Sequence, residues 1–468
     1  MGLWSNTHTP NSHTFPSASL RCKKNLQLLQ YKGALVELSA LRVYRTSEYS
    51  LEEINRRLLP PAANIAGAQR IVEEIVARVR VEGDAAVLEL TRKFDWPEAT
   101  LDGLTVSAAE MEHALAETDP AVIAAMTQAA ANIRRYHERQ MPADWDEEFA
   151  PGLRLGQRHV PVDSAACYVP TRKASIPSSL LMSVVPAQVT GVPRIVVVGP
   201  CRADGTLPAG VLAAAHLLGI TEIYKLGGAV AMAALAFGTD TFPKVDKVVG
   251  PANIFGTLAK KALYGEVGVD GLYGPSEVAV IADGSVPAEW IAVDLVSQSE
   301  HGEDSQSVLI TPDEEYAQAV GVAVGELLAT SPRAKYLSAA LENRGAIVLT
   351  RDLSEAAAMA NLLAPEHLEL AVADPRALLP LIRHAGSILL GGASPVPVGD
   401  YFAGPSHILP TGRTARFSSG LGVMDFLTRS SLIELTPTWL AGQADAITTL
   451  ADHEGLDAHA LAVRKRVP

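Results

Sequence analysis

The sequence predicts an α/β fold built on two parallel sheets, and two observations carry this prediction. From Arg194 onward, short β-branched runs alternate with helical stretches rich in Ala and Leu, at a spacing of about 25 residues. A turn-rich break at 271–275 divides the series into two sheets. The predicted strands are 158–162, 166–169, 195–198, 222–225, 247–249, 278–281, 307–310, 346–349, 368–371 and 387–390, with helices such as 209–218 and 230–236 between them.

The N-terminal third shows helical patterns instead. Apolar residues recur at helical spacing within 66–80. Ser107 and Glu110 form a capping-box pattern, and Asp119-Pro120 is typical of an N-cap followed by Pro at the first helical position. Near the other end, a loop rich in Pro and Gly covers 391–412, and we expect a helical tail after Phe417.

Composition indicates a large globular protein and argues against other classes. Of the 468 residues, 48% are hydrophobic and 19% charged, which is enough apolar material for a core without disulfides. The formal net charge of −13 argues against a nucleic-acid partner. No apolar run reaches the ~18 residues of a membrane span, and three scattered cysteines fit a reducing compartment. We therefore expect a cytoplasmic protein that binds neither nucleic acid nor membrane.

The first 36 residues differ from the rest of the chain. They contain Arg21, Lys23, Lys24 and Lys32 but no Asp or Glu, and they are rich in Ser, Thr, Asn and Pro. Such a segment is typical of an organelle transit peptide, which would indicate a plastid, or of a disordered extension. Both interpretations stay open, and residues 1–38 are expected to lie outside the fold.

The usual glycine fingerprints of nucleotide binding are missing from the sequence. It contains neither G-x-G-x-x-G nor G-x-x-x-x-G-K-[ST]. Gly227-Gly228 follows the predicted strand 222–225 and opens a helix, whose N-terminus is suited to a pyrophosphate. A tight turn is the ordinary alternative for two glycines at such a junction.

Two polar pairs carry candidate chemistry, each with a structural alternative. Gln298 and His301 lie three residues apart at the end of a predicted helix, so they share one face. They offer ligands suited to zinc, or they form a plain polar helix end. Glu366-His367 joins an acid to an imidazole between a helix and a strand, as an acid–base pair or as a surface dipeptide.

Three later residues are also candidates. Asp400 lies in the loop rich in Pro and Gly, where a lone carboxylate has few structural reasons to be. Glu454 and His459 lie five residues apart near the end of the chain, where a solvated helix face is the alternative. Alone, none of these signals identifies a site.

Together, the strings around these residues resemble the histidinol dehydrogenase family, zinc enzymes that complete histidine biosynthesis. The matching segments occur in the family's order, from about residue 40 to the end. They are Tyr168-Val-Pro, Pro177-Ser-Ser, Gly227-Gly-Ala, Lys244 to Asn253, Gly274-Pro-Ser-Glu-Val, Ser297-Gln-Ser-Glu-His, Ala364-Pro-Glu-His-Leu-Glu, Gly399-Asp-Tyr and Thr414-Ala-Arg-Phe-Ser-Ser-Gly.

The resemblance implies the residues of the active site. Glu366 and His367 match the catalytic acid–base pair. The implied ligands of one zinc ion per subunit are Gln298, His301, Asp400 and His459. The implied substrate contacts are Ser276, Gln298, His301, His367, Asp400, Glu454 and His459. The implied NAD⁺-binding positions are Tyr168, Val230 and Asn253.

The resemblance also implies two Rossmann-like domains in a homodimer with shared active sites. In the family the last His ligand comes from the partner subunit, so an N-terminal helical arm (39–62) and a C-terminal tail (421–468) would be exchanged. The first, catalytic domain would comprise 63–167 and 276–420. The second domain, 168–275, would bind the cofactor. The implied reaction oxidises L-histidinol through L-histidinal to L-histidine with two NAD⁺.

Three positions depart from the family pattern. Val230 replaces a Gln that often follows Gly-Gly, and Ala252 stands where Gly is common. Thr171-Arg172, followed by Lys173, replaces a Gly-Gly pair. These changes concern cofactor affinity rather than hydride chemistry, and they make Arg172 and Lys173 candidates for binding the cofactor's phosphates.

Two other functions stay open. A paralogue of the family would oxidise another polar alcohol, such as a sulfonated diol, although Glu454 would repel a sulfonate. A protein without catalysis would keep the fold as a metal-binding dimerisation unit. The complete set of metal, base and substrate residues argues against that second alternative.

Overall fold

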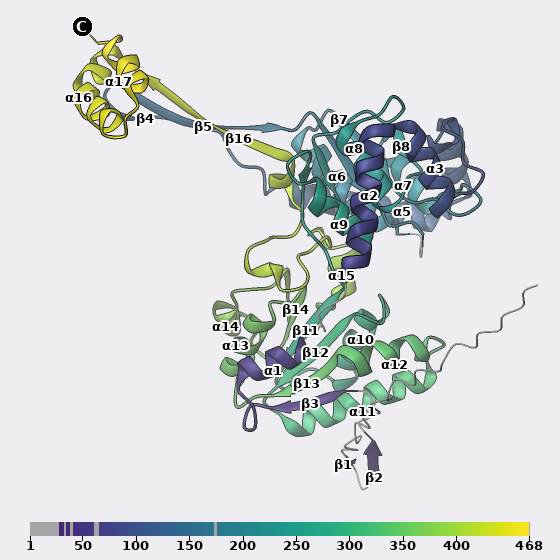
Figure 1. The fold of residues 1–468 in the computed structure, drawn as a ribbon. Helices are drawn as coiled ribbons and strands as arrows, with labels where there is room; N and C mark the ends of the chain where they lie inside the picture. The colour runs from purple at the N-terminus through teal and green to yellow at the C-terminus, as the bar shows by residue number, and fades with distance from the viewer. Residues whose placement is uncertain (1–27, 32–33, 38–40, 60–64, 173–175, 468) are drawn as a thin grey trace, which may run out of the picture.

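The computed structural model describes residues 28–31, 34–37, 41–59, 65–172 and 176–467. These residues form two α/β lobes, each centred on a parallel sheet, and an arm that projects away from them (Figure 1). The prediction of two parallel sheets joined near 271–275 is confirmed. Within the described part of the chain, no helix has the length and apolar character needed to cross a bilayer.

The six-stranded lobe has the strand order β15-β14-β11-β12-β13-β3. The strands are β3 (Arg42–Arg45), β11 (Glu277–Ala282), β12 (Gln306–Thr311), β13 (Gly345–Leu349), β14 (His367–Ala371) and β15 (Ser387–Leu390). One face is covered by α10 (Ala288–Ser299), α11 (Glu314–Thr330) and α12 (Ala334–Arg344). The other face is covered by α1 (Leu51–Leu58), α13 (Leu353–Leu363) and α14 (Pro375–Leu378).

The central strands of this lobe are apolar along their length because both of their faces are covered. In β11, Val278 and Val280 pack under α10 and α11, whereas Ala279 and Ile281 pack under α1 and α13. Alternate side chains of a strand point to opposite faces, so a strand between two helical layers needs apolar residues throughout. This is why the sequence shows continuous β-branched runs.

The five-stranded lobe has the order β10-β9-β6-β7-β8, also parallel throughout. Its strands are β6 (Ser164–Tyr168), β7 (Arg194–Val198), β8 (Glu222–Tyr224), β9 (Lys247–Val249) and β10 (Gly268–Val269). One face is covered by α4 (Ala108–Glu117), α5 (Pro120–Glu138), α6 (Pro177–Thr190) and α7 (Ala209–Leu217). The other is covered by α2 (Ala66–Glu82), α3 (Asp84–Phe94), α8 (Gly228–Phe237) and α9 (Ile254–Leu263).

The domain division differs from the one expected from the sequence. Helices α2 to α5 pack on the five-stranded sheet, so residues 65–138 do not belong to a domain with 276–420. The reason is the burial of apolar side chains. Val72, Ile75 and Val79 of α2 pack in the same hydrophobic core cluster as Tyr168 and Val230. The capping box of Ser107 with Glu110 and the Asp119 cap are present as predicted.

The N-terminal segments also differ from expectation. The predicted arm, 39–62, begins with a strand, β3, which pairs in parallel with β13 of the same chain. Ile54 and Leu58 of α1 are buried in the core of the six-stranded lobe, so this segment is an integral part of it. The end of the predicted leader holds two short strands, β1 (Leu28–Tyr31) and β2 (Ala34–Glu37), paired as a hairpin. Residues 1–27 lie outside the described part of the chain.

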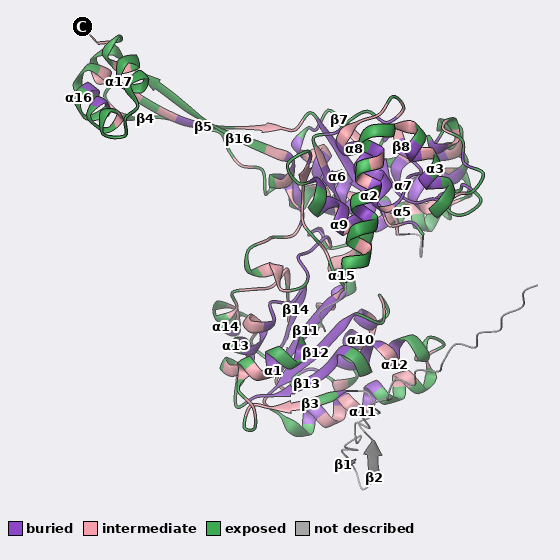
Figure 2. Ribbon diagram, viewed as in Figure 1, coloured by how far each residue is buried: buried purple, intermediate pink, exposed green. Residues whose placement is uncertain are grey.

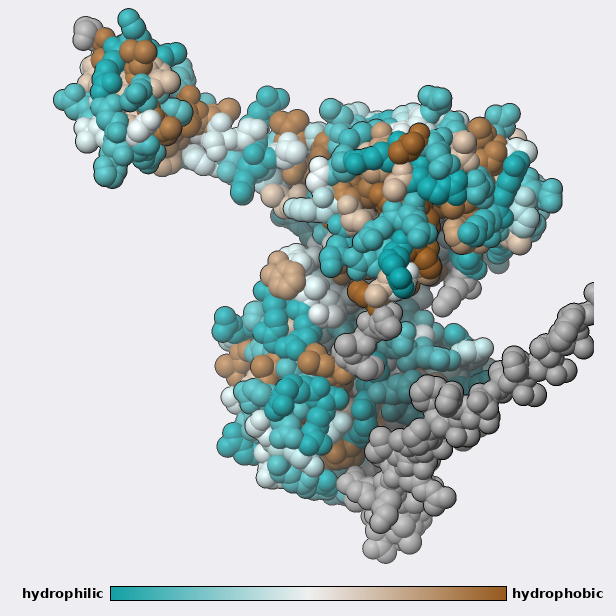
Figure 3. Space-filling model, viewed as in Figure 1, coloured by the Kyte–Doolittle hydropathy of each residue, from teal (hydrophilic) through white to brown (hydrophobic). Residues whose placement is uncertain are grey.

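The arm combines two distant parts of the sequence. It contains the antiparallel strands β4 (Trp145–Ala150), β5 (Leu153–Pro161) and β16 (Leu427–Leu435), followed by α16 (Pro437–His453) and α17 (Asp457–Arg464). The predicted helical tail therefore begins with a strand. Strands β4 and β16 of the arm are mostly exposed, whereas the central strands of both lobes are buried (Figure 2). Apolar side chains lie open on its surface (Figure 3).

Candidate active site

The two lobes meet where the carboxyl ends of the strands of one sheet face the amino ends of the strands of the other. The chain leaves the carboxyl end of β10 and enters the amino end of β11 through residues 270–276. In the five-stranded sheet, the chain runs from β6 to β7 and β8 on one side and then crosses to β9 on the other side of β6. Ligands of open α/β sheets bind outside the carboxyl ends of the strands at such a switch point. The amino edge of the six-stranded sheet faces this position.

Glu366 and His367 lie at that amino edge, at the start of β14. Helix α13 ends at Ala364, which adopts a left-handed conformation with φ of 47°, and Pro365 cannot extend the helix. A non-glycine residue in this conformation is strained, and such strain concentrates at functional sites. Glu366 and His367 are 7% and 5% exposed. The turn therefore delivers an acid and an imidazole, both buried, to the junction of the lobes.

The imidazole of His367 lies between two carboxyl groups. Its Nε2 is 3.4 Å from Oδ1 of Asp400, and its Nδ1 is 3.7 Å from Oε2 of Glu366. Burial lowers the pKa of His367, but the hydrogen bond to Asp400 and the charge of Glu366 outweigh burial, so the pKa is raised. Burial raises the pKa of the Glu366 carboxyl to about 7. Glu366 is thus able to exchange a proton near neutral pH.

Gln298 is a buried amide without a protein partner. It lies in the last turn of α10, is 1% exposed, and neither Oε1 nor Nε2 has a hydrogen-bond partner. Leaving a buried polar group unpaired costs about 1–3 kcal/mol, so this amide indicates a ligand. His301 follows directly after the helix, as predicted.

Electrostatics around Gln298 suit a cation. Loss of water around the His301 ring lowers its pKa, with the charge of Asp400 opposing, which favours the neutral ring. Burial raises the pKa of Asp400, but the hydrogen bond to His367 outweighs burial, and the pKa is lowered. An amide oxygen, a neutral imidazole and a carboxylate are ligands that zinc accepts. The three residues therefore fit the predicted metal.

Two of the other predicted ligand and substrate residues, Glu454 and His459, lie away from the Glu366–His367 pair. Glu454 follows α16 and His459 lies in α17, both exposed on the arm, which projects away from the lobes (Figure 1). Ser276 directly precedes β11, and its carbonyl accepts the N–H of Gln306 at 2.9 Å. Within the described ranges, no three His, Cys, Asp or Glu side chains form a group suited to a metal ion. One chain thus supplies only part of the predicted metal site.

Sequence reasoning missed three polar residues at the site. His407 contacts the carbonyl of Asp400 through Nδ1 at 2.8 Å and Oγ of Ser179 through Nε2 at 3.1 Å. Glu277, the first residue of β11, donates its backbone N–H to Oε2 of Glu366 at 2.9 Å. Glu277 and Ser179 lay within matching motifs, and a charged residue at the start of a buried strand was the one available signal for Glu277.

The predicted cofactor residues follow strands of the five-stranded sheet. Tyr168 ends β6, and its hydroxyl accepts the N–H of Gly228 at 3.1 Å. Gly228 begins α8 with φ of 49°, which explains a glycine at this turn. Asn253 follows β9 and caps α9 by accepting the N–H of Gly256 at 3.1 Å. The side chain of Val230 is 3% exposed and packs in the apolar core.

Arg172 lies next to the turn that begins α8. It forms an ion pair with Asp95 and donates from Nη2 to the carbonyl of Phe94 at 2.6 Å. A Cβ added at Gly227 would come within 2.6 Å of Oδ2 of Asp95, so the ion pair lies against the Gly227-Gly228 turn. Arg172 is therefore at the predicted cofactor edge with its charge paired. Lys173 lies outside the described residues.

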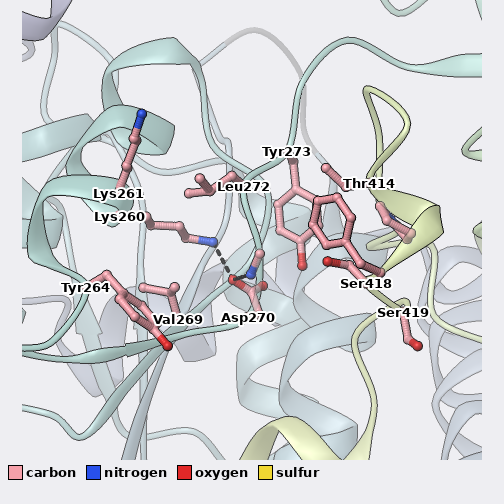
Figure 4. Close-up of a pocket in the computed structure, with 13 residues that line it drawn as sticks. Lys260, Lys261, Tyr264, Val269, Asp270, Leu272, Tyr273, Thr414, Ser418 and Ser419 are labelled. Carbon is pink, nitrogen blue, oxygen red and sulfur yellow. Dashed lines mark hydrogen bonds and ion pairs between the residues drawn. The ribbon is translucent and has the colours of Figure 1, made fainter.

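A separate pocket of about 340 Å³ lies where the edge of the five-stranded sheet meets residues 410–419 (Figure 4). Lys260 and Asp270 form an ion pair at its wall, with Nζ and Oδ1 2.7 Å apart and both side chains 1% exposed. Among the described residues that line the pocket, none is a predicted catalytic, metal or cofactor residue. The pocket is therefore separate from the Glu366–His367 pair.

The fold and the site define a class of protein. A buried acid–base pair, with a carboxylate next to its imidazole, lies where two parallel α/β sheets meet, and an unpaired buried amide lies in the last turn of α10 of the same lobe. This is the arrangement of a two-lobed α/β enzyme that uses acid–base chemistry.

Comparison with known proteins identifies the family within that class. The family model described as histidinol dehydrogenase matches residues 60–467. Histidinol dehydrogenase of Geobacillus kaustophilus is 50% identical over 399 residues, which cover 85% of this chain and 94% of that one. Histidinol dehydrogenase of Cereibacter sphaeroides is 50% identical over 397 residues, covering 85% and 91%. A crystal structure of histidinol dehydrogenase from Elizabethkingia anophelis matches with a TM-score of 0.86 at 34% identity, covering 92% of this chain and 98% of that one. The chain belongs to the histidinol dehydrogenase family, as its motifs predicted.

Proposed function

We propose that this protein is a zinc-dependent L-histidinol dehydrogenase. It oxidises L-histidinol through L-histidinal to L-histidine, the last step of histidine biosynthesis, with two NAD⁺. The observation that carries the proposal is the cluster of Glu366, His367 and Asp400, in a chain of this family that also holds the unpartnered buried amide of Gln298.

In the first oxidation, His367 takes the proton of the substrate hydroxyl while a hydride leaves the same carbon. NAD⁺, when bound near Tyr168 and Asn253, supplies the acceptor for that hydride. Asp400, 3.4 Å from Nε2, favours the protonated imidazole that results. The alcohol becomes the aldehyde, and one NADH leaves.

In the second oxidation, Glu366 activates water. The water oxygen bonds to the aldehyde carbon as its proton passes to Glu366, and His367, protonated in the first oxidation, returns its proton to the aldehyde oxygen, which gives a hydrated aldehyde. His367 takes a hydroxyl proton from this species, and a second hydride leaves to a second NAD⁺. Burial of Glu366 and His367 keeps bulk water away from the reactive aldehyde between the two steps.

Gln298, His301 and Asp400 would hold zinc together with His459 from a second copy of the chain. Bound there, zinc supplies a grip on the imidazole and amino nitrogens of the substrate and so orients it. The unpaired amide of Gln298 and the lowered pKa of Asp400 support this ligand set.

The second copy is a homodimer partner that exchanges the C-terminal tail. The exposure of the arm supports this part of the proposal, because its helices bury only Ala444, Thr448 and Ala460. Phe149, Ile433 and Leu450 of the arm are 58%, 71% and 65% exposed, which leaves apolar surface for a partner to cover. We also propose a cytoplasmic location, since a reducing compartment suits the buried free thiols of Cys167 and Cys201.

The test is an assay of the purified, zinc-loaded chain with L-histidinol and NAD⁺. We expect about two NADH for each histidinol consumed, with histidine as the product identified by mass spectrometry. A chelator should abolish turnover, and zinc should restore it. The matched control is the His367→Asn variant, which keeps the ligand set.

Two results would overturn the proposal. A stoichiometry of one NADH would show that oxidation stops at the aldehyde. Turnover of a sulfonated diol or another polar alcohol, with none of histidinol, would assign the chain to a paralogue.

A further inference from the structure

Glu277 is a second buried carboxyl group next to the proposed water-activating base. It is 6% exposed, and its backbone N–H donates to Oε2 of Glu366 at 2.9 Å. Its own Oε2 accepts the backbone N–H of Gly412 at 3.2 Å. The two carboxyl groups therefore lie at the same sheet edge, away from water, and neither serves an apolar core.

The positive charges that face Glu277 belong to two arginines. Arg344 ends α12 and is 7% exposed; its Nη1 donates to the carbonyl of Asp304 at 2.9 Å, while its Nε and Nη2 have no partner. Arg413 faces Glu277 from the loop before residue 414, in a left-handed conformation with φ of 70°. The attraction of these cations lowers the pKa of Glu277, but burial is the larger effect and raises it to about 7.

The charges that face Glu366 are His367, Glu277 and Asp400. Burial raises the pKa of Glu366 most, His367 and the N–H of Glu277 lower it, and the charges of Glu277 and Asp400 raise it again. The carboxylate of Glu277 is thus one of the groups that oppose ionisation of Glu366. Two buried carboxyl groups that interact in this way take up and release protons as a pair.

We propose that Glu277 is a positioning residue for Glu366: its backbone N–H fixes the carboxylate, and its buried carboxyl, at the same sheet edge, acts on Glu366 through its charge. The proposal rests on the role of Glu366 in activating water. When the water oxygen bonds to the aldehyde carbon, the water proton goes to Glu366, and repulsion from an ionised Glu277 strengthens Glu366 as a base. Glu277 touches neither substrate nor cofactor in this scheme.

The test is the Glu277→Gln variant, which keeps an oxygen to accept the N–H of Gly412 but removes the charge. Infrared titration with isotope-labelled glutamate measures the ionisation of Glu366 in the zinc-loaded enzyme. We expect its midpoint to fall by about half a pH unit or more, because a repelling charge is gone. The acid limb of the rate of aldehyde oxidation should move to lower pH by the same amount. In the Glu366→Gln variant the midpoint of Glu277 should fall by a similar amount, because coupling between two sites is reciprocal.

Asp425→Asn is the matched control. Asp425 is also a buried carboxyl whose pKa burial raises to about 6, and it is faced by Lys247, Asp270 and Lys260 rather than by Glu366. Its replacement should leave the midpoint of Glu366 unchanged.

The outcomes separate the two proposals. A Glu277→Gln variant with lower thermal stability and slower turnover at every pH, but an unmoved midpoint, would overturn the pairing and leave a structural role. A reciprocal shift in the infrared titration, in a chain that does not oxidise histidinol, would support the pairing and overturn the proposed function instead.

Discussion

Ser179 and His407 form a hydrogen bond between two elements that the sequence separates by 228 residues, with Oγ and Nε2 3.1 Å apart. Ser179 lies in the first turn of α6 in the five-stranded lobe. The other ring nitrogen of His407 contacts the carbonyl of Asp400 at 2.8 Å. The cofactor edge is thereby connected to a proposed metal ligand through one imidazole.

Removal of the Ser179 hydroxyl should leave Asp400 less firmly positioned. We expect Ser179→Ala to lower the free energy of unfolding by about 1 kcal/mol and to weaken zinc binding several-fold, because His407 loses one of its two anchors. Chemical denaturation and competition with a zinc indicator measure the two effects. Ser183→Ala is the control, since that hydroxyl donates to backbone carbonyls within α6 rather than to His407. Equal zinc affinity in both variants would contradict the connection.

The two members of the acid–base pair should fail at different steps. His367→Asn removes the base of both oxidations, so turnover should fall by about 10²–10⁴-fold while NAD⁺ binding persists. Glu366→Gln should spare alcohol oxidation and slow aldehyde oxidation, giving close to one NADH per histidinol. Single-turnover NADH absorbance, with calorimetry for NAD⁺, distinguishes the variants. The assignment is wrong if Glu366→Gln still yields two NADH at the wild-type rate.

The arm should supply His459 to a neighbour. His459→Ala is expected to lose zinc and activity while keeping its helical circular dichroism, because the residue is exposed. Mixing it with His367→Asn subunits, after dissociation and reassociation, should recover about a quarter of the sites, since only one site of each heterodimer is complete. His453→Ala, which changes another exposed histidine of the arm, is the control and should keep zinc and activity by itself. Proven heterodimers without recovered activity would place each site within one chain.

The buried ion pair at the pocket wall should matter for stability rather than for chemistry. Lys260 donates to Oδ1 of Asp270 at 2.7 Å and to the carbonyl of Gly250 at 2.5 Å. Lys260→Met leaves a buried carboxylate unpaired, so the free energy of unfolding should fall by about 3–5 kcal/mol. The Lys260→Met, Asp270→Asn double variant should recover part of this loss in a denaturant titration. A single variant as stable as the wild type would show that Asp270 is paired in another way.

A second pair of carboxyl groups should make stability depend on pH. Asp294 of α10 and Glu369 of β14 contact each other, and burial raises the pKa of Glu369 to about 9. The folded protein therefore keeps a proton on this pair that the unfolded chain releases above about pH 4.3. Stability from this group is full at low pH and falls as pH rises towards 9.

The Glu369→Gln variant tests that direction. It should flatten the decline in the free energy of unfolding between about pH 6 and about pH 9, and so be more stable than the wild type at the alkaline end. Asp425→Asn serves as control, because its pKa of about 6 places its effect below this range. Parallel slopes for the wild type and Glu369→Gln would refute the shared proton.

The strands and the position of Glu366-His367 between a helix and a strand were predictable because their signals are local. Buried parallel strands require continuous apolar runs, so the sequence located the strands from Arg194 to Leu390 to within a few residues, except the two-residue β10 (Gly268–Val269). The Ser107 cap and the Glu366-His367 junction likewise depend on neighbours in the chain. The family motifs then supplied roles that spacing alone left open.

The rest depended on contacts that local patterns do not contain. Apolar faces on α2 to α5 show that these helices are buried, but not on which sheet, so the domain division was wrong. Strand β16 is largely exposed and pairs with residues about 270 positions earlier, so it lacked the apolar pattern of a core strand. His407 became visible as part of the site only through its partners, Ser179 and Asp400.

The exposed arm makes the activity of the protein depend on its abundance. Its two helices bury only Ala444, Thr448 and Ala460, which is too little apolar burial to hold them together unaided. In the proposed homodimer, their folding free energy comes from association, so by mass action it grows with the concentration of the chain itself. Specific activity should therefore fall on dilution. A cell that makes too little of this protein would lose catalysis faster than it loses protein.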